Sequence, residues 1–489
     1  MGTTRVLRGA LLDELEKIGA IGTALLPHQQ RVVDRIQRSD QPGLVVAHGL
    51  GSGKTLASIA AQDALKMRAN VVVPASLRAN YAKERTKHIE GNAQPANIES
   101  TTNVANKGQP GKAPLLIVDE AHRARDTASK TYKGLSENEA EKRLLLTGSP
   151  FYNHPSDIAG LINIAAGSSV MPGDREGFNQ RYITQRKIAP SFFNRLRGMK
   201  PGVVDELNQR RAGELQSTFK KWVDYHPGSR EGFPDVQRED VEVPMTRGQM
   251  RVYDTMMRQA PSWVAEKVRA GLPPSKREAA QLNHFLSAVR QISNTTSGFQ
   301  QEGSHDPKID TAFGRLQKNL GDDPTSKAVV YSNFLESGVH PYKSRLQQAK
   351  IPFGEFTGEM AHDERDQMVR DYNAGKLRTL LLSSAGGEGL DLKGTRLLQE
   401  LEPHWNEEKL RQVEGRGARF GSHAELPEGQ RNLHIERYLA TRPRSGILER
   451  AHLKKPGKAV DQYLAQLSTD KEKLIGQFRG LLPQEQVAG

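Results

Sequence analysis

The chain has 489 residues, enough for two or three domains with large cores, and a formal net charge of +13 at pH 7. It contains no cysteine, which excludes disulfides, thiolate zinc sites and a cysteine nucleophile. No run approaches the roughly eighteen consecutive apolar residues of a transmembrane helix. The basic surplus favours a polyanionic partner, nucleic acid before a membrane surface.

The first predicted element is an amphipathic helix over residues 1–22, with Leu11, Leu15 and Ile18 on one face. Acidic residues interrupt any signal-peptide core at this end: Asp13, Glu14 and Glu16. We therefore expect a soluble protein in the cytoplasm of a bacterial or virus-infected cell, associated with DNA.

A glycine-rich loop, GLGSGKT, follows a predicted buried strand over 43–47 and precedes a predicted helix over 56–61. Its glycines let backbone N–H groups face a phosphate, and the helix N-terminus adds partial positive charge. We expect Lys54 to reach the β- and γ-phosphates of ATP and the Thr55 hydroxyl to bind Mg²⁺. The strict pattern has glycine where this chain has His48, but the strand–turn–helix context agrees. The other loop positions expected at the nucleotide are Gly49, Gly51, Ser52 and Gly53.

Two carboxylates, Asp119 and Glu120, end a second apolar run at 115–118. The end of a parallel strand is where ligands bind in open α/β sheets. We expect Asp119 to hold Mg²⁺ and Glu120 to orient the attacking water. Alone, such a pair is more often solvated surface, but the phosphate loop upstream favours catalysis.

The rest of the first half contains a predicted strand at 71–73, an exposed polar loop at 91–112 and a helical period at 158–164. An irregular basic stretch then spans 171–240. Within it, residues 175–230 carry twelve Lys or Arg against five Asp or Glu, which is +7 of the net charge. This segment is either a polyanion-binding surface or a merely solvated basic one.

A second α/β pattern follows, with predicted strands at 328–331 and 379–382. Apolar residues then recur at helical spacing over 459–482, which predicts one long amphipathic helix.

Further motifs resemble those of the Swi/Snf-type family, the DNA-translocase branch of the superfamily two helicase-like ATPases. The resemblance covers roughly residues 25–480, and its segments are Val73 to Leu77, Leu146 to Pro150, Arg290 to Asn294, Gly386 to Leu390 and Pro403 to Asn406. It implies an α/β fold of two tandem RecA-like lobes, each a mostly parallel sheet flanked by helices. It also implies helical insertions, a C-terminal helix, and ATP with Mg²⁺ as cofactors.

The predicted domain boundaries follow from the motifs and this resemblance. They are an N-terminal helical extension (1–24), lobe 1 (25–228) with a basic helical insertion (about 151–228), lobe 2 (229–445) with a helical insertion (about 245–300), and a C-terminal helical brace (446–489).

The resemblance also assigns nucleotide-binding roles. Gln29 matches the glutamine that recognises adenine, and Arg416 and Arg419 match arginines that reach across the cleft to the γ-phosphate. These two arginines lie three apart, so on a helix they share a face, and a guanidinium suits the charge that develops on a transferred phosphoryl group. The further positions implied at the nucleotide are Gly389, Asp391 and the catalytic Gln412.

Nucleic-acid contacts are implied at seven positions: Ser76, Thr147, Ser332, Ser384, Gly386, Gly387 and Trp405. Thr147, with Ser149, resembles the segment that couples hydrolysis to lobe movement. Trp405 resembles an aromatic that probes the duplex, although a tryptophan beside Pro403 and His404 also suits a core.

The chain departs from many family members in being short and in having Gly415 before Arg416, which fits a compact bacterial or viral motor. We expect a monomeric, DNA-stimulated ATPase that translocates on double-stranded DNA and remodels DNA or protein–DNA complexes. The alternatives are a strand-separating helicase, an ATPase serving viral transcription, and a non-catalytic architectural or virion component. The intact Lys54, Glu120 and Arg416 argue against the last.

Overall fold

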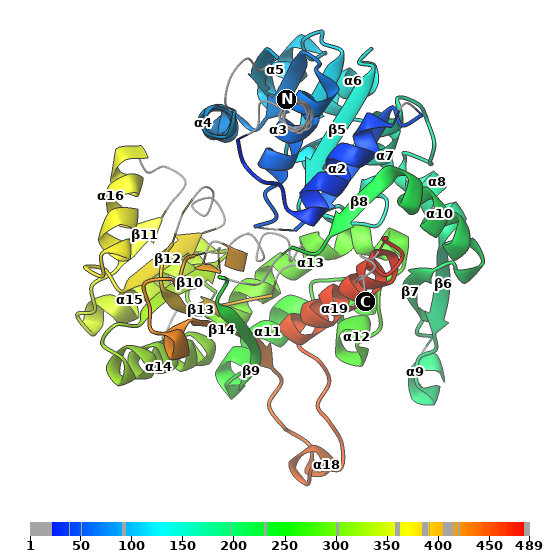
Figure 1. Ribbon diagram of the computed structural model, residues 1–489. Coiled ribbons are helices and arrows are strands. Elements are labelled where there is room, and N and C mark those ends of the chain that lie inside the picture. Colours follow the sequence, from blue (N-terminus) through cyan, green and yellow to red (C-terminus); the bar gives the residue numbers. More distant parts are fainter. Residues whose placement is uncertain are drawn as a thin grey trace, which may run out of the picture. The chain divides into compact units, whose positions relative to one another are not determined.

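Two six-stranded parallel β-sheets, one in each of two compact units, organise the chain (Figure 1). The first unit comprises Met1–Thr184, Glu206–Ser229 and Leu474–Gly489, and the second comprises Gln185–Asp205 and Arg230–Lys473. The computed structural model describes residues 22–38, 40–49, 51–89, 94–196, 198–228, 232–299, 303–356, 362–383, 390, 392–403, 414–415, 417–418 and 421–483. The predicted N-terminal helix, which occupies residues 1–22, therefore lies almost wholly outside the described residues.

The sheet of the first unit has the strand order β3-β2-β4-β5-β1-β8, and all neighbouring strands are parallel. Its strands are β1 (Gly43–His48), β2 (Ala69–Val73), β3 (Ala96–Ser100), β4 (Leu115–Val118), β5 (Lys142–Thr147) and β8 (Val223–His226). The central strands are continuous apolar runs because both faces of the sheet are buried.

Helices cover the two faces of this sheet. They are α2 (Pro27–Gln37), α3 (Lys54–Leu65), α4 (Arg78–His88), α5 (Thr101–Lys107), α6 (Lys130–Ser136), α7 (Asp157–Ala166), α8 (Arg175–Tyr182) and α10 (Ala212–Trp222). Val46 packs with residues of α2 and α3 in one core, whereas the adjacent Val45 packs with residues of α7, α8 and α10 in the other. This alternation along β1 fixes which helices lie beside the loop that follows it.

The expectation of an exposed loop over 91–112 is wrong. Residues Ala96–Ser100 form β3, the edge strand that pairs with β2, and helix α5 follows directly. An edge strand is only partly covered, so it does not need the apolar run by which the central strands are recognised. The Ser100 hydroxyl then caps α5 by accepting from the backbone N–H of Asn103.

The sheet of the second unit has the order β11-β12-β10-β13-β14-β9 and is also parallel throughout. Its strands are β9 (Asp235–Pro244), β10 (Lys327–Ser332), β11 (Gly354–Phe356), β12 (Thr379–Ser383), β13 (Thr395–Glu400) and β14 (Asn432–Thr441). Its helices are α11 (Arg247–Met257), α12 (Ser262–Ala270), α13 (Lys276–Asn294), α14 (Pro307–Asp322), α15 (His340–Gln348), α16 (His362–Asn373) and α18 (Ile447–Arg450). Helices α14 and α15 pack on one face and α16 on the other, so the predicted two-sheet α/β fold class is confirmed.

A separate two-stranded hairpin of β6 (Ile183–Ile188) and β7 (Gly202–Leu207) carries the short helix α9 (Phe192–Leu196) between its strands (Figure 1). Its residues 185–205 belong to the second unit, where Gly202 approaches Pro273 so closely that a Cβ would lie 2.8 Å from the proline Cδ. The predicted basic stretch therefore contains strands as well as helices.

The long amphipathic helix predicted over 459–482 is confirmed as α19 (Val460–Arg479). Tyr463 and Leu464 pack in a helical core of the second unit with residues of α11, α12 and α13. Ile475 and Phe478 pack in the core of the first unit.

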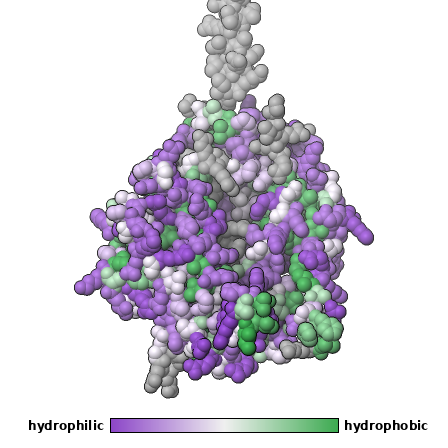
Figure 2. Space-filling model, turned by 90° about the horizontal axis from the view of Figure 1, so that it is seen from below, coloured by the Kyte–Doolittle hydropathy of each residue, from purple (hydrophilic) through white to green (hydrophobic). Residues whose placement is uncertain are grey.

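Among the described helices, none combines the length and apolar character that crossing a membrane requires. Figure 2 shows a face on which hydrophilic side chains predominate and hydrophobic ones gather in small separate patches. Large exposed apolar side chains occur chiefly at two places, α9 and the segment around α18.

Candidate nucleotide site

The predicted phosphate loop connects the end of β1 to the start of α3. Gly51 and Gly53 have φ angles of 73° and 69°, the left-handed region that side chains with a Cβ rarely adopt. Gly53 is also the N-cap of α3, so the positive end of that helix lies at the loop. The glycines thus have the conformational role that the sequence predicts, and Thr55 is the second residue of the helix.

Lys54 closes this loop. Its Nζ donates hydrogen bonds to the carbonyl oxygens of His48, at 2.9 Å, and Gly49, at 3.2 Å. Burial lowers the pKa of Lys54, whereas the nearby Glu120 and Asp119 raise it. The Lys54 ammonium group therefore lies at the loop, next to Asp119 and Glu120, the two carboxylates that follow β4.

Asp119 and Glu120 are adjacent in the chain but differ in their electrostatics. Burial, followed by the charge of Glu120, raises the pKa of Asp119 to about 6. Burial also raises the pKa of Glu120, but a hydrogen bond and charge from His122, together with the charges of Lys54 and Arg123, outweigh burial and lower this pKa overall. Glu120 Oε2 lies 3.2 Å from His122 Nδ1, so Glu120 is the more firmly ionised of the pair. Carboxylates with separated pKa values are suited to different roles in one reaction.

The backbone of Glu120 is strained. Its φ is 49° and its ψ is 45°, a left-handed conformation for a residue with a full side chain. Such strain costs on the order of 1–3 kcal/mol and persists where the surroundings hold it, often at functional sites.

The segment that follows β5 lies near Lys54 and His122. A Cβ added to Gly148 would be 3.7 Å from Lys54 Nζ, and the backbone N–H of Ser149 donates to Thr147 Oγ1 at 3.1 Å. Thr147 Oγ1 lies 3.5 Å from His122 Nδ1, the same atom that faces Glu120. The Leu146–Pro150 motif thus lies near both the lysine and the carboxylate.

The His122 ring also stacks on the ring of Tyr152. The Tyr152 ring lies parallel to it with centroids 5.0 Å apart, and the Arg125 guanidinium lies 4.3 Å from the centroid of the same tyrosine ring. Arg125 also donates to the His122 carbonyl oxygen at 2.9 Å. No motif of the sequence includes Tyr152 or Arg125: Tyr152 lies two residues after Pro150, and Arg125 lies five residues after Glu120.

Gln29 touches the phosphate loop directly. Its Nε2 donates to the Ser52 carbonyl oxygen at 2.9 Å, and its Oε1 accepts from the Leu26 backbone N–H at 2.9 Å. The side chain is buried, and a Cβ on Gly53 would lie 2.3 Å from Nε2. Gln29 is therefore part of the loop's packing.

The sequence motifs do not predict a polar network that lies beside the phosphate loop. It is formed by His28, Arg31, His48, Asp224 and His226. The one signal for it is His48, which occupies the glycine position of the strict motif. Asp224 lies 176 residues further along the chain and belongs to no motif, so only the fold reveals it.

The structure brings ten of the predicted site residues together in the first unit: Gln29, Gly49, Gly51, Ser52, Gly53, Lys54, Thr55, Asp119, Glu120 and Thr147. Nine others lie outside the described residues: Ser384, Gly386, Gly387, Gly389, Asp391, Trp405, Gln412, Arg416 and Arg419.

Of the described residues expected at nucleic acid, Ser76 is exposed, but Thr147 and Ser332 are 0 % and 1 % exposed. The Ser332 hydroxyl donates to Glu402, 3.0 and 3.1 Å from its two oxygens. In this arrangement neither hydroxyl reaches solvent, and direct contact of either residue with nucleic acid stays a prediction. Both side chains support neighbouring backbone.

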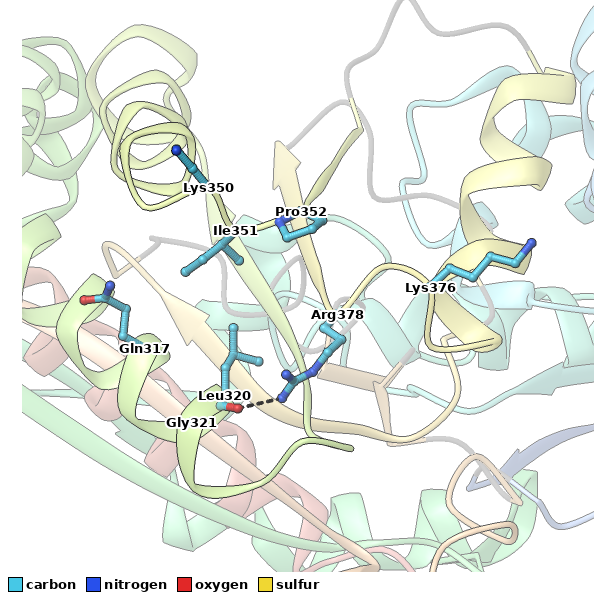
Figure 3. A pocket seen from close by; sticks show the side chains of 8 residues that line it. All are labelled: Gln317, Leu320, Gly321, Lys350, Ile351, Pro352, Lys376 and Arg378. Atoms are coloured by element: carbon cyan, nitrogen blue, oxygen red, sulfur yellow. Dashed lines mark hydrogen bonds between the residues drawn. The ribbon is translucent and has the colours of Figure 1, made fainter.

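A pocket in the second unit lies among α14, the segment after α15, and the start of β12 (Figure 3). Arg378 is one of its lining residues, and this guanidinium already donates to the carbonyl oxygens of Leu320, Asp323 and Ser326. The pocket contains none of the predicted site residues.

One cluster among the described residues has metal-ligand spacing: Glu239, His434 and Glu436. Arg315 lies 2.9 Å from Glu239 and 3.0 Å from Glu436, so a guanidinium already forms ion pairs with both carboxylates. We therefore assign no ion to this cluster.

The chain matches two protein-family models. The SNF2-related domain matches residues 98–297, and the helicase conserved C-terminal domain matches residues 311–421. Neither range includes the phosphate loop. The longer alignments with individual proteins do extend over nearly the whole chain.

A putative ATP-dependent RNA helicase of Acanthamoeba polyphaga mimivirus is 28% identical over 474 residues, covering 93% of this chain and 96% of that protein. A termination factor NPH-I homolog of African swine fever virus is 23% identical over 554 residues, covering 91% of this chain and 76% of that protein. Among solved structures, the Hef helicase domain of Pyrococcus furiosus has 15% sequence identity and a TM-score of 0.49, covering 87% of this chain and 96% of that one.

The two matched domains follow each other in the order of a helicase-like ATPase, and the relatives align over most of their own length. The chain is therefore an ATP-hydrolysing enzyme with an SNF2-related domain and a helicase C-terminal domain, as in the Swi/Snf-type, helicase-like ATPases of superfamily two.

Proposed function

We propose that the chain is a DNA-stimulated ATPase that translocates on double-stranded DNA and remodels DNA or protein–DNA complexes. The observation that carries the proposal is the group formed by Lys54, Asp119 and Glu120 beside a glycine loop, in a chain with a helicase C-terminal domain. The +13 net charge supports a nucleic-acid partner.

At the nucleotide, Lys54 contacts the β- and γ-phosphates and Glu120 orients the attacking water. Thr55 and Asp119 offer a hydroxyl and a carboxylate, the oxygen ligands that Mg²⁺ prefers, so these residues fit the ion. A bound ion also favours the charged form of Asp119, whose pKa is otherwise raised to about 6. Gln29, which packs against the phosphate loop, recognises the adenine base. The sequence adds Gly389, Asp391, Gln412, Arg416 and Arg419 to the proposed site.

The hairpin of β6 and β7 supplies a nucleic-acid surface. Residues 185–204 contain five cations and no carboxylate: Arg186, Lys187, Arg195, Arg197 and Lys200. At the tip, Phe192 and Phe193 are 67% and 74% exposed. Cations that track a backbone and aromatic rings that stack on bases form a common combination in nucleic-acid grooves.

Charge reversal tests this surface. We expect the triple variant Arg195→Glu, Arg197→Glu, Lys200→Glu to bind duplex DNA more weakly and to reduce the log–log salt slope by about 0.9 for each DNA phosphate that the hairpin no longer neutralises. The measurement is duplex affinity across a salt series. The control reverses three exposed lysines of the first unit, Lys66, Lys107 and Lys112, and so changes the net charge equally. Equal slopes in the two triple variants would show that the hairpin charge is only solvated.

Duplex tracking is tested by displacement of a third strand. A translocase is expected to release a triplex-forming strand from a long duplex in an ATP-dependent way and to leave a blunt duplex paired. Trp405→Ala should reduce this release more than it reduces basal ATP turnover, because the proposed Trp405 contact is with DNA. Equal losses of both activities would assign Trp405 to the core. Strand separation without triplex release would identify a helicase.

A second candidate function is an ATPase that serves viral transcription. The similarity to a termination factor homolog over 91% of this chain favours it. The similarity to a putative RNA helicase likewise motivates an RNA duplex among the tested substrates. Release of a stalled transcript by the purified chain and a polymerase would select the transcription role.

We also propose that the motor is monomeric and works in the virus-infected cell. For its organisation we retain the division into an N-terminal extension (1–24), lobe 1 (25–228), lobe 2 (229–445) and a C-terminal brace (446–489). Sedimentation with and without duplex tests the monomer.

A further inference from the structure

The phosphate loop is held from behind by a buried polar network. His48, the last residue of β1, is 0% exposed, and its Nε2 lies 2.7 Å from Asp224 Oδ1. Its Nδ1 has no hydrogen-bond partner among the described residues, so the His48 side chain is held by its hydrogen bond to Asp224. Because the partner is a carboxylate, Nε2 carries the proton and donates.

Asp224 also accepts hydrogen bonds from two further side chains. Arg31 binds it with two nitrogens, Nε at 2.9 Å from Oδ2 and Nη2 at 2.9 Å from Oδ1, and Arg35 Nη1 lies 3.1 Å from Oδ2. The carboxylate is 1% exposed, and burial raises its pKa. The donors His48 and Arg31 outweigh burial and hold this pKa well below its ordinary value. Asp224 is thus a fully ionised carboxylate satisfied on both oxygens.

The two elements that Asp224 joins both hold the loop. Helix α2 carries the two arginines and also His28, whose Nε2 lies 2.8 Å from the Ser52 carbonyl oxygen, beside the Gln29 contact to the same atom. Strand β8 carries Asp224 and also His226, whose carbonyl oxygen accepts from the Gly49 backbone N–H at 2.8 Å. The His28 and His226 rings stack with centroids 3.9 Å apart.

The backbone of the phosphate loop packs closely against the end of β8. A Cβ on Gly49 would lie 2.2 Å from the Pro227 carbonyl oxygen, so the loop backbone rests directly on the end of β8. Lys54 in turn donates to the carbonyl oxygens of His48 and Gly49. A displacement of β8 relative to α2 therefore moves the atoms that orient Lys54.

We propose that Asp224 is a positioning residue for ATP binding. It clamps α2, β1 and β8 around the phosphate loop and acts through His48 and Arg31. This inference rests on the proposed nucleotide site and adds to it a residue from outside the motifs. It predicts that loss of the carboxylate weakens nucleotide binding more than it slows the chemical step, because Asp119 and Glu120 stand on a different strand.

The test is Asp224→Asn, which keeps the shape of the side chain and removes its charge. We expect KM for ATP to rise roughly tenfold to hundredfold, by analogy with residues that orient metal ligands from behind, whose removal costs about 10- to 100-fold in affinity or activity. We expect kcat to stay within about threefold, since each tenfold change in rate needs its own loss of transition-state stabilisation. The matched control is Asp240→Asn. This aspartate forms the same kind of two-point pair, with Arg437 at 2.8 and 2.9 Å, in the second unit, and its loss should leave both constants unchanged.

A second pair of variants covers the case in which Asp224→Asn does not fold. His48→Gln retains a donor that reaches Asp224, and we expect near-normal KM. His48→Phe removes the donor, and we expect the raised KM of the aspartate variant. An unchanged KM in Asp224→Asn, or equal KM values for the two His48 variants, would overturn the positioning role. A fall in thermal unfolding midpoint alone would reduce Asp224 to a structural residue. Normal turnover in Lys54→Ala would instead refute the nucleotide site itself.

Discussion

Replacing Lys54 with alanine is expected to abolish ATP turnover. The lysine is the cation at the phosphate loop, and in the proposed site its removal leaves the β- and γ-phosphates of ATP without their principal charge partner. Losing such a group commonly costs a few kcal/mol of barrier, so we expect a rate loss of about 10²-fold or more. Steady-state ATP hydrolysis measures this directly.

Glu120→Gln separates chemistry from binding in the same experiment. The amide keeps the shape of the side chain but cannot act as the ionised group that His122 stabilises. We expect hydrolysis to be lost to the same extent while a fluorescent nucleotide still binds. Arg437→Gln serves as a control, since Arg437 pairs with Asp240 in the second unit. Near-normal turnover in either Lys54→Ala or Glu120→Gln would refute the assignment of this site.

Arg416→Ala is the second large effect that we expect. An arginine that stabilises charge on the transferred phosphoryl group contributes roughly 10³-fold or more to turnover. ATP and DNA binding should be retained, because the interaction is formed mainly in the transition state. Single-turnover hydrolysis together with nucleotide and duplex binding isolates this step.

The conservative variant Arg416→Lys sharpens the result. A lysine keeps the positive charge but lacks the planar fork of donors, so we expect it to restore little of the lost rate. Normal hydrolysis in Arg416→Ala would make it an ordinary surface arginine.

Local sequence signals predict the phosphate loop and the sheets well. Left-handed backbone at Gly51 and Gly53 follows from glycine in a strand–turn–helix context, and the apolar runs at 43–47 and 115–118 mark strands buried on both faces. The helix over 459–482 is predictable because its apolar period is long and unbroken.

Features that depend on non-local contacts cannot be predicted in this way. Strand β3 at the sheet edge has a polar sequence, which is typical of a loop. Asp224 meets Arg31 across 193 residues of chain, and no motif marks either end. The family resemblance implies nucleic-acid contacts at Thr147 and Ser332, yet the packing of each unit buries their hydroxyls.

One assay measures whether ATP hydrolysis is coupled to duplex DNA. ATP turnover is measured with no nucleic acid, with single-stranded DNA, with blunt duplex DNA and with a forked duplex, with Lys54→Ala as the blank. We expect low turnover without nucleic acid and stimulation by blunt duplex at least as strong as by single strand. Stimulation that requires a single strand or a fork, with blunt duplex inert, would refute translocation on duplex DNA.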